Sequence, residues 1–268
     1  MKLDNCNALI TGASAGIGRE FARQLAGGAS SLILVARREE KLVELRDELR
    51  LQHPKLDVHM RKVDLADPAQ LKELIAWLDH EKLDIDLLVN NAGLGHTGPF
   101  ATSDPSRNKQ VTLVNIVAVT SLTRHLLPPM IAKQHGGILN VSSSAGFLPI
   151  PGDAVYAATK AYVTSFSEAL RAELRGTGVS VCALCPGPVR TEFQEVARRP
   201  EAQPQAGSEL FLVPVEQVVR EALRALEADR PLVIPGSAMK IAMFLARLMP
   251  MPVLRLVARL LPSRSRAT

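Results

Sequence analysis

Short apolar runs alternate with longer amphipathic segments along most of this 268-residue chain. The apolar runs have the length of buried strands and occupy residues 7–11, 31–35, 56–63, 85–89, 137–141, 179–184 and 231–235. The amphipathic segments have helical periodicity and occupy residues 19–26, 39–51, 67–80, 105–128, 154–175 and 215–226. Because strands that alternate with helices at this rhythm build a parallel sheet covered on both faces, the pattern predicts a doubly wound α/β domain.

Two stretches depart from this alternation. Residues 194–213 have no periodicity, which fits either a substrate lid or a plain surface loop. Residues 237–261 are apolar with interspersed basic side chains, and two prolines divide them into two predicted amphipathic helices. We therefore expect one folded domain over residues 1–235 and a helical tail over 236–268. The tail fits a lid, a subunit contact or a membrane-surface anchor.

The net charge of +5 belongs to the tail rather than to the body of the chain. From Gly236 onward there are six basic residues and no acidic one, so the remainder carries a net charge of −1. A nucleic-acid-binding protein more often places basic charge on its folded surface together with aromatic side chains, and aromatics make up only 4% of this chain. Nucleic-acid binding is therefore not expected, whereas a basic amphipathic tail suits an anionic membrane surface.

The three cysteines, Cys6, Cys182 and Cys185, form no disulfide framework and indicate a reducing compartment. The Cys182–Cys185 spacing matches a redox or zinc motif, but it lies in a predicted strand, where an offset of three places the thiols on opposite faces. No second Cys/His pair has zinc spacing, so no metal site is expected. The polar N-terminus and the lack of a run of about 18 apolar residues lead us to expect a cytoplasmic protein without a membrane-spanning helix.

A glycine-rich turn joins the first predicted strand to the first predicted helix. Gly12, Gly16 and Gly18 stand where a dinucleotide-binding loop lets the backbone approach a pyrophosphate, and the helix N-terminus supplies free N–H groups. Ser14 and Ile17 lie in the same loop and are expected to contact the cofactor. An ordinary strand–helix turn has similar residues, but the position in the first βα unit favours a Rossmann-type cofactor site.

The residues after the second strand bear on the choice of cofactor. An acidic residue about 20 positions after the loop usually binds the ribose 2′-OH of NAD. This chain has Arg37 and Arg38 there, and guanidinium groups bind a phosphate with two parallel hydrogen bonds. The pair favours NADP(H), and NAD(H) stays the alternative if both arginines only begin a solvated helix.

Tyr156 and Lys160 are about one helical turn apart, so both side chains project from the same helix face. A phenol ionises near ~10 and is a poor base at neutral pH. A fixed ammonium group nearby favours the phenolate, so we expect Lys160 to lower the pKa of Tyr156 and make it a proton donor and acceptor near pH 7. The same spacing also occurs in surface pairs that have no chemical role. The serines at 142–144 and the glycine turn favour a catalytic pair over a surface pair.

Taken together, the motifs resemble those of the short-chain dehydrogenase/reductase family over about residues 5–235. The matching motifs are residues 11–18 with their three glycines, Asn90-Asn91-Ala92-Gly93, Asn115, Ser143, Tyr156-x-x-x-Lys160 and Pro186-Gly187. In that family the catalytic serine precedes the tyrosine by thirteen residues, which selects Ser143 over Ser142 and Ser144. The resemblance implies a Rossmann domain that interconverts a carbonyl and an alcohol by hydride transfer with a nicotinamide cofactor.

The resemblance also implies a role for each matching residue. Tyr156 would exchange the proton, Lys160 would hold the nicotinamide ribose, Ser143 would hydrogen-bond the carbonyl oxygen, and Asn115 would position a water that leads from Lys160 to solvent. Further cofactor contacts are implied for Asp64, Leu65, Asn91, Ala92, Gly93, Pro186, Gly187, Val189 and Thr191. By position alone, Asp64 also fits a helix cap. Homodimers or homotetramers would form by pairing the helices that carry Asn115 and Tyr156.

Apolar residues near the predicted pocket favour a lipophilic ketone, such as a 3-oxoacyl chain or a steroid-like ring. Phe147 and Phe193 are the candidates, beside Ser143 and Tyr156. Two other functions fit parts of the pattern. A non-catalytic NADP-binding sensor or scaffold would need only the glycine turn. A sugar-nucleotide epimerase or dehydratase shares the Tyr–Lys pair but typically carries a longer C-terminal substrate domain.

Overall fold

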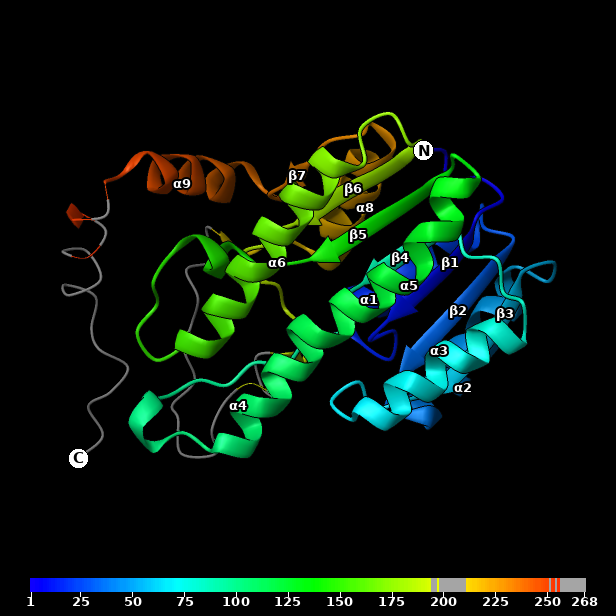
Figure 1. Ribbon diagram of the computed structural model, residues 1–268, viewed down its shortest axis with the longest axis horizontal. Coiled ribbons are helices and arrows are strands. Elements are labelled where there is room, and N and C mark those ends of the chain that lie inside the picture. Colours follow the sequence, from blue (N-terminus) through cyan, green and yellow to red (C-terminus); the bar gives the residue numbers. More distant parts are fainter. Residues whose placement is uncertain (194–196, 198–210, 251, 254, 256–268) are drawn as a thin grey trace.

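The computed structural model describes residues 1–193, 197, 211–250, 252, 253 and 255, and within them parallel strands form one sheet (Figure 1). The strands are β1 Asn7–Thr11, β2 Ser31–Ala36, β3 Asp57–Lys62, β4 Leu87–Asn90, β5 Gly136–Val141, β6 Val179–Leu184 and β7 Leu232–Val233. They lie in the order β3-β2-β1-β4-β5-β6-β7, and every neighbouring pair is parallel. The order reverses between β1 and β4, and in open α/β sheets ligands bind above the carboxyl ends of the strands at this point.

Helices cover both faces of the sheet, as the sequence predicts (Figure 1). One face is covered by α1 Gly16–Ala26, α2 Glu39–Gln52 and α8 Val215–Glu227, and the other by α3 Pro68–His80, α4 Pro105–Thr112, α5 Val119–Ala132 and α6 Ala154–Glu173. In β2, Leu32 and Leu34 pack on the first layer, while Ile33 and Val35 pack on the second. Side chains alternate between the two faces of the sheet, and both faces are buried. The strands therefore have apolar residues at successive positions in the sequence.

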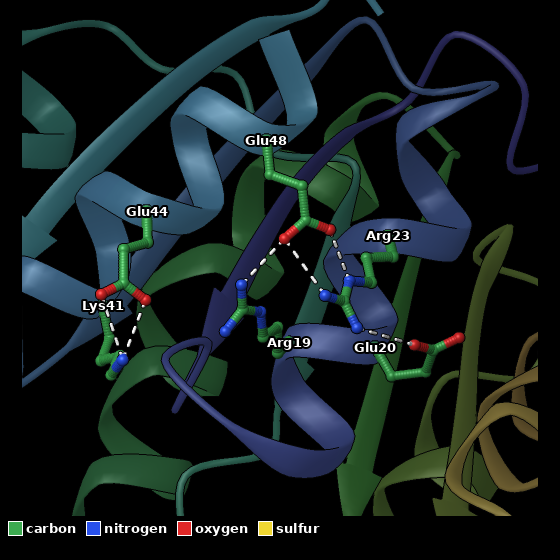
Figure 2. A network of polar contacts seen from close by, with 6 residues as sticks. All are labelled: Arg19, Glu20, Arg23, Lys41, Glu44 and Glu48. Atoms are coloured by element: carbon green, nitrogen blue, oxygen red, sulfur yellow. Dashed lines mark hydrogen bonds and ion pairs between the residues drawn. The ribbon is translucent and has the colours of Figure 1, made fainter. Parts of the chain in front are cut away.

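The helix α1, which carries the glycine turn at its start, is held mainly by apolar packing. Phe21 and Leu25 are buried against the sheet. On the outer side, Glu48 of α2 accepts hydrogen bonds from Arg19 at 2.8 Å and from Arg23 at 2.6 Å (Figure 2). Partly exposed ion pairs of this kind contribute little individually. The buried face of α1 therefore fixes its position, and Glu48 joins it to its neighbour.

The helix predicted over 105–128 extends further than expected. The structure continues from α4 through a π-helical turn, η2 Leu113–Ala118, into α5, so Pro128 and Pro129 lie inside the last turns rather than ending the helix. The prolines have no N–H to donate, but their carbonyls still accept hydrogen bonds from later residues: the Lys133 N–H donates to the Pro129 carbonyl at 3.1 Å. Similarly, α1 begins at Gly16, inside the glycine turn, and not at Arg19.

The same long helix corrects the expectation that no segment has the length and apolarity of a membrane span. Among the residues that the structure describes, Pro105–Ala132 alone passes that test by length and composition. Val111, Leu122 and Met130 are buried on one face of the sheet, and 44% of the apolar window is buried inside the protein. Core helices of this kind pass the same test, because their buried face is as apolar as a membrane segment.

The positions of the cysteines and of the first tail helix agree with the sequence-based expectations. Cys182 packs in the core on the α1 face, whereas the Cys185 sulfur lies 3.7 Å from Thr164 Oγ1 of α6, so the two thiols point to opposite sides of the sheet. The first tail helix is present as α9, Ser237–Leu248. Most of the predicted lid at 194–213 and of the second tail helix lies outside the described residues. The division of domains at residue 235 stays a prediction.

Candidate active site

A cavity of about 640 Å³ lies above the carboxyl ends of the strands. It extends from Arg37 and Arg38 after β2, past the glycine turn, to Tyr156 on α6. The other predicted residues that line it are Gly12, Ser14, Gly16, Ile17, Asp64, Leu65, Asn91, Ala92, Gly93, Ser143, Lys160, Pro186, Gly187, Val189, Thr191 and Phe193. Gly18, Asn115 and Phe147 do not line it. The sheet thus gathers residues from six successive strand ends at one elongated cavity.

The glycine turn has the shape of a phosphate cradle. Gly12 and Gly16 have φ angles of +67° and +52°, which side chains with a Cβ rarely adopt. At Gly18 a Cβ would lie 2.3 Å from the Gly12 carbonyl oxygen, so this glycine allows α1 to pack closely on the turn rather than touching the cavity. The α1 N-terminus has no side-chain cap, which leaves its first N–H groups available to an anionic ligand. These residues fit a dinucleotide pyrophosphate.

The Asn-Asn-Ala-Gly segment after β4 holds that turn in place. Asn91 Nδ2 donates to the carbonyls of Thr11 at 2.9 Å and Gly12 at 3.2 Å. In return, Thr11 Oγ1 accepts from the backbone N–H groups of Asn91 and Ala92, both at 3.0 Å. These bonds join the ends of β1 and β4 at the reversal of strand order. Thr11 was not among the predicted site residues, although its hydroxyl organises the cavity floor.

Asp64 and Leu65 lie in the cavity wall after β3. The alternative interpretation of Asp64 as the cap of the following helix does not apply, because Asp67 caps α3 by accepting from the Ala69 N–H at 2.9 Å. Asp64 Oδ1 instead accepts from the Ala66 N–H at 3.0 Å. Asp64 is thereby held at the end of the cavity where residues from β2 and β3 meet.

An ion pair spans the cavity wall near the arginines. Arg38 Nη1 lies 2.8 Å from the carboxylate of Glu192, which is in the segment after β6, and Arg38 Nη2 donates to Ser14 Oγ at 3.5 Å. Arg37 lines the same end of the cavity. Sequence reasoning missed Glu192, because the pair joins residues far apart in the chain and no local pattern marks it.

Ser143 and Tyr156 meet at the opposite end. Ser143 is the second residue after β5 and caps the short helix η3, Ser144–Phe147, by accepting from the Ala145 N–H at 3.1 Å. Tyr156 lies in the first turn of α6 and lines the cavity beside Ser143, whose side chain acts to lower the pKa of the tyrosine. The Tyr156 ring packs against Phe193 with centroids 5.6 Å apart. The two hydroxyl groups therefore point to one place in the cavity.

In the isolated chain the net shift in the pKa of Tyr156 is opposite to the lowering that the neighbouring Lys160 predicts. Burial raises the pKa of Tyr156 to about 12, the hydrogen bond with Ser143 opposes this rise, and Asp153 adds to it. Burial also lowers the pKa of Lys160 to about 8. Lys160 Nζ lies 5.8 Å from the centre of the tyrosine ring and donates to the Val141 carbonyl at 2.8 Å. Burial therefore sets the direction of both pKa shifts.

Asn115 supports the site from behind. It lies in the π-helical turn η2, where its Nδ2 donates to the Leu94 carbonyl and to Thr159 Oγ1, both at 2.9 Å, and its Oδ1 accepts from the Leu94 N–H. The side chain thus ties α6 to the segment after β4. Thr159, between Tyr156 and Lys160, was missed as a partner, although it stands inside the motif. A water-positioning role for Asn115 stays a prediction.

The two predicted substrate phenylalanines have different positions. Phe193 lines the cavity beside Tyr156. Phe147 instead packs under α9 with Met239 and Met243, and the guanidinium of Arg247 lies 5.4 Å from its ring centre. Ile150, which was not predicted individually, lines the cavity. Among the described residues, no group of three or more His, Cys, Asp or Glu side chains could hold a metal ion.

Comparisons with known proteins agree with this arrangement. A family model described as short chain dehydrogenase matches residues 6–202. The NADP-dependent 3-hydroxy acid dehydrogenase YdfG of Escherichia coli (strain K12) is 39% identical over 191 residues, which cover 70% of this chain and 75% of that protein. A short chain dehydrogenase of Pseudocercospora fijiensis is 36% identical over 194 residues, which cover 72% of this chain and 62% of that protein.

A solved structure extends the likeness over nearly the whole chain. The short-chain dehydrogenase from Sphingobium yanoikuyae in complex with NADPH has a TM-score of 0.80 and 29% sequence identity, and the alignment covers 98% of both chains. The sheet order, the glycine turn and the Ser–Tyr–Lys cluster are thus found in a chain that matches this family along most of its length. The protein belongs to the short-chain dehydrogenase/reductase family of NAD(P)-dependent oxidoreductases.

Proposed function

We propose that this protein is an NADP-dependent oxidoreductase that interconverts a carbonyl group and a secondary alcohol on a lipophilic substrate. The observation that carries the proposal is that Ser143, Tyr156 and Lys160 line the same cavity as the uncapped start of α1. One end of the cavity can hold a pyrophosphate, and the other presents two hydroxyl groups to a reacting oxygen.

The preference for NADP(H) rests on Arg37 and Arg38. Both line the end of the cavity where an acidic residue would otherwise bind an unphosphorylated ribose. Two guanidinium groups there supply charge and paired donors for a 2′-phosphate. The relative YdfG is NADP-dependent, and the Sphingobium yanoikuyae structure contains NADPH, which supports the same choice here. NAD(H) remains a weaker cofactor in this proposal.

The proposed proton transfer follows from the protonation states of Tyr156 and Lys160. The bound nicotinamide supplies or accepts the hydride. Ser143 donates a hydrogen bond to the carbonyl oxygen, which stabilises developing negative charge by about 3 kcal/mol in comparable sites. With its pKa raised to about 12, Tyr156 holds its proton across the neutral range and can give it to the forming alkoxide. Lys160, buried beside it, stabilises the phenolate that results.

The substrate end of the cavity favours an apolar molecule. Leu94, Ile150 and Phe193 line it together with Ala145 and Ala197. Such walls bind a ketone with aliphatic or ring substituents through burial of apolar surface. A 3-oxoacyl chain or a steroid-like ketone has apolar substituents of this kind. Neither needs a charged side chain beside its carbonyl carbon.

The proposal includes a homodimer or homotetramer in the cytoplasm. The helices expected to pair, α4–α5 and α6, carry the exposed apolar side chains Val117, Ile131 and Tyr162. Exposed apolar side chains on long helices are typical of subunit contacts. Three free cysteines, all buried, support a reducing compartment.

The first test is oxidation of NADPH, followed by absorbance, over a panel of carbonyl compounds and in parallel with NADH. We expect Tyr156→Phe to reduce turnover by several powers of ten while NADPH binding, followed by fluorescence, stays nearly unchanged, because the phenol donates the proton but does not hold the phosphates. Tyr162→Phe, on the same helix and exposed, is the matched control and should keep wild-type turnover.

Two outcomes would contradict the proposal. A Tyr156→Phe variant with turnover near that of the wild type would show that another group transfers the proton. An inactive wild-type protein that binds NADPH and remains inactive across the whole carbonyl panel would instead favour a sensor or scaffold of the same fold.

A further inference from the structure

The helix α9 has two apolar faces, only one of which packs on the rest of the protein. Met239, Met243 and Ala246 are buried against Phe147, Leu148 and neighbouring side chains. On the opposite face, four large apolar side chains are mostly exposed: Ile241 61%, Phe244 62%, Leu245 51% and Leu248 66%. Their spacing of three, four and seven residues places them in one stripe along the helix. We call these four residues the α9 stripe.

The α9 stripe is an exception on this surface. Leu51 and Phe100 are more distant from other exposed apolar residues in the sequence, and single exposed apolar side chains are normal for a soluble protein. Val117, Ile131 and Tyr162, on the helices expected to pair, are each less than 40% exposed, whereas each residue of the α9 stripe is more than half exposed. Next to the stripe, Met249 and Val253 are also exposed and extend the apolar surface beyond the helix end. A contiguous apolar patch of this kind indicates a binding surface. Figure 1 shows α9 at the edge of the molecule, beyond β7.

The positive charges beside the α9 stripe indicate that its partner carries negative charge. Lys240 and Arg247 are exposed and seven residues apart, so both lie along one flank of the stripe. From Gly236 to the C-terminus, the sequence has six basic residues and no acidic one. The preceding helix α8, by contrast, carries Glu216, Glu221 and Glu227 among its basic residues. An apolar stripe bordered only by cations fits a surface with an apolar interior and anionic groups at its boundary.

A second copy of the chain fits the stripe poorly. Two α9 helices placed face to face would bring Lys240 and Arg247 close to the same cations of the partner. A stable interface also covers about 800 Å² on each partner, far more than four side chains of one helix provide. The helix has only 12 residues.

We propose that α9 binds peripherally to the surface of an anionic lipid bilayer. The α9 stripe enters the boundary between headgroups and acyl chains, and Lys240 on the flank of the helix lies at the level of the anionic headgroups. The inner face stays on the protein, so the helix lies flat between the fold and the lipid.

This docking connects the membrane to the substrate end of the cavity. The inner face of α9 contacts Phe147, which ends the short helix that Ser143 begins, and a Cβ at Gly187 would lie 2.6 Å from Met239 Cε. A lipid-bound α9 therefore places the Ser143 side of the cavity close to the bilayer, where a lipophilic ketone is concentrated. This last step rests on the proposed function, whereas lipid binding itself does not.

The test is co-sedimentation of the full-length protein with vesicles in the absence of substrate, so that its result does not depend on activity. We expect binding to phosphatidylcholine vesicles that contain phosphatidylglycerol, little binding to phosphatidylcholine alone, and loss of binding near about 0.5 M NaCl, where surface charges are screened. The double variant Phe244→Ser/Leu248→Ser should lower the partition coefficient by about tenfold or more, because two large side chains no longer enter the lipid.

Matched variants separate lipid binding from general effects. Leu51→Ser, on α2, removes an exposed leucine away from the tail and should bind vesicles as the wild type does. Lys240→Glu should weaken binding more than Lys72→Glu, an exposed position on α3, although both change the net charge equally. Circular dichroism and NADPH binding check that each variant folds.

The proposal is overturned by any of three results: no binding of the wild type to anionic vesicles at low salt, equal binding of the stripe variant, or equal losses with Lys240→Glu and Lys72→Glu. Light scattering tests the competing occupant. A wild-type oligomer that dissociates in the stripe variant would show that a second copy covers α9 instead.

Discussion

At the scale of single residues, the side chains of Tyr156 and Lys160 lie on one face of α6 but contact different neighbours. The Lys160 ammonium donates to the Val141 carbonyl, and the Tyr156 ring packs against Phe193 in the cavity that Ser143 also lines. Each group is removed from water, and burial disfavours the charged form of both. The chain alone is therefore set to donate a proton from Tyr156, and Lys160 loses its charge more easily than an exposed lysine.

The lowered pKa of Lys160 predicts a specific dependence of stability on pH. Between about 8 in the folded chain and 10.5 in the unfolded chain, the unfolded state binds more protons, so the contribution of Lys160 to the free energy of unfolding rises with pH. We expect wild type to gain up to about 3 kcal/mol relative to Lys160→Met between pH 7 and pH 10.5. Urea unfolding of both proteins at several pH values measures this, and a constant difference would contradict it.

Glu192 makes a second prediction at this scale, because its carboxylate takes the position on Arg38 that a 2′-phosphate would need. Glu192→Gln removes this competition, and we expect the Kd for NADPH to fall by roughly threefold, within the range of a partly exposed ion pair. The Kd for NADH should not change. Glu39→Gln is the control, since Glu39 follows Arg38 in sequence but pairs with Lys62. Equal effects on both cofactors would show that Glu192 does not act through the phosphate.

At the scale of elements, α1 combines cofactor binding with packing in one short segment. Its first turn leaves N–H groups free, and Gly18 lets it approach the Gly12 carbonyl. Asn91 and Thr11 then fix the turn from the side of β4. A rigid cradle of this kind binds a phosphate without paying for ordering of the loop.

Gly18→Ala tests that packing. The added Cβ would lie 2.3 Å from the Gly12 carbonyl and 2.4 Å from Asn91 Nδ2, so the turn or the helix must move. We expect a melting temperature lower by several degrees, as for overpacking of about 1–3 kcal/mol, and weaker NADPH binding. Gly27→Ala, at the other end of α1, is the control, because its Cβ would meet only His53 at 3.8 Å. A Gly18→Ala variant as stable as Gly27→Ala would disprove close packing at this position.

At the scale of the whole molecule, the sheet order brings together residues that are far apart in the chain. The reversal between β1 and β4 opens one cavity above the strand ends, and β5 and β6 add Ser143 and the Pro186-Gly187 turn to it. The tail helix α9 packs beside that end and exposes the α9 stripe. The proposed lipid contact is therefore next to the end of the cavity that holds Ser143 and the Pro186-Gly187 turn.

The sequence by itself determined the alternation of strands and helices, because doubly buried strands need continuous apolar runs and helices need periodic ones. It also identified the glycine turn, Ser143, Tyr156 and Lys160, since these residues stand in local motifs with narrow spacing. Helix ends were predicted less accurately: α1 begins at Gly16 rather than Arg19, and α5 continues past Pro128 and Pro129 to Ala132.

Only the tertiary structure decided which groups meet and how far they are buried. The Arg38–Glu192 pair, the support of Asn115 by Thr159 and the removal of Phe147 from the cavity all depend on contacts between distant segments. The pKa of Tyr156 shows the physical reason most clearly. Helical spacing predicts a neighbouring charge, but the ionisation depends on the surrounding loss of water, which a one-dimensional pattern does not contain.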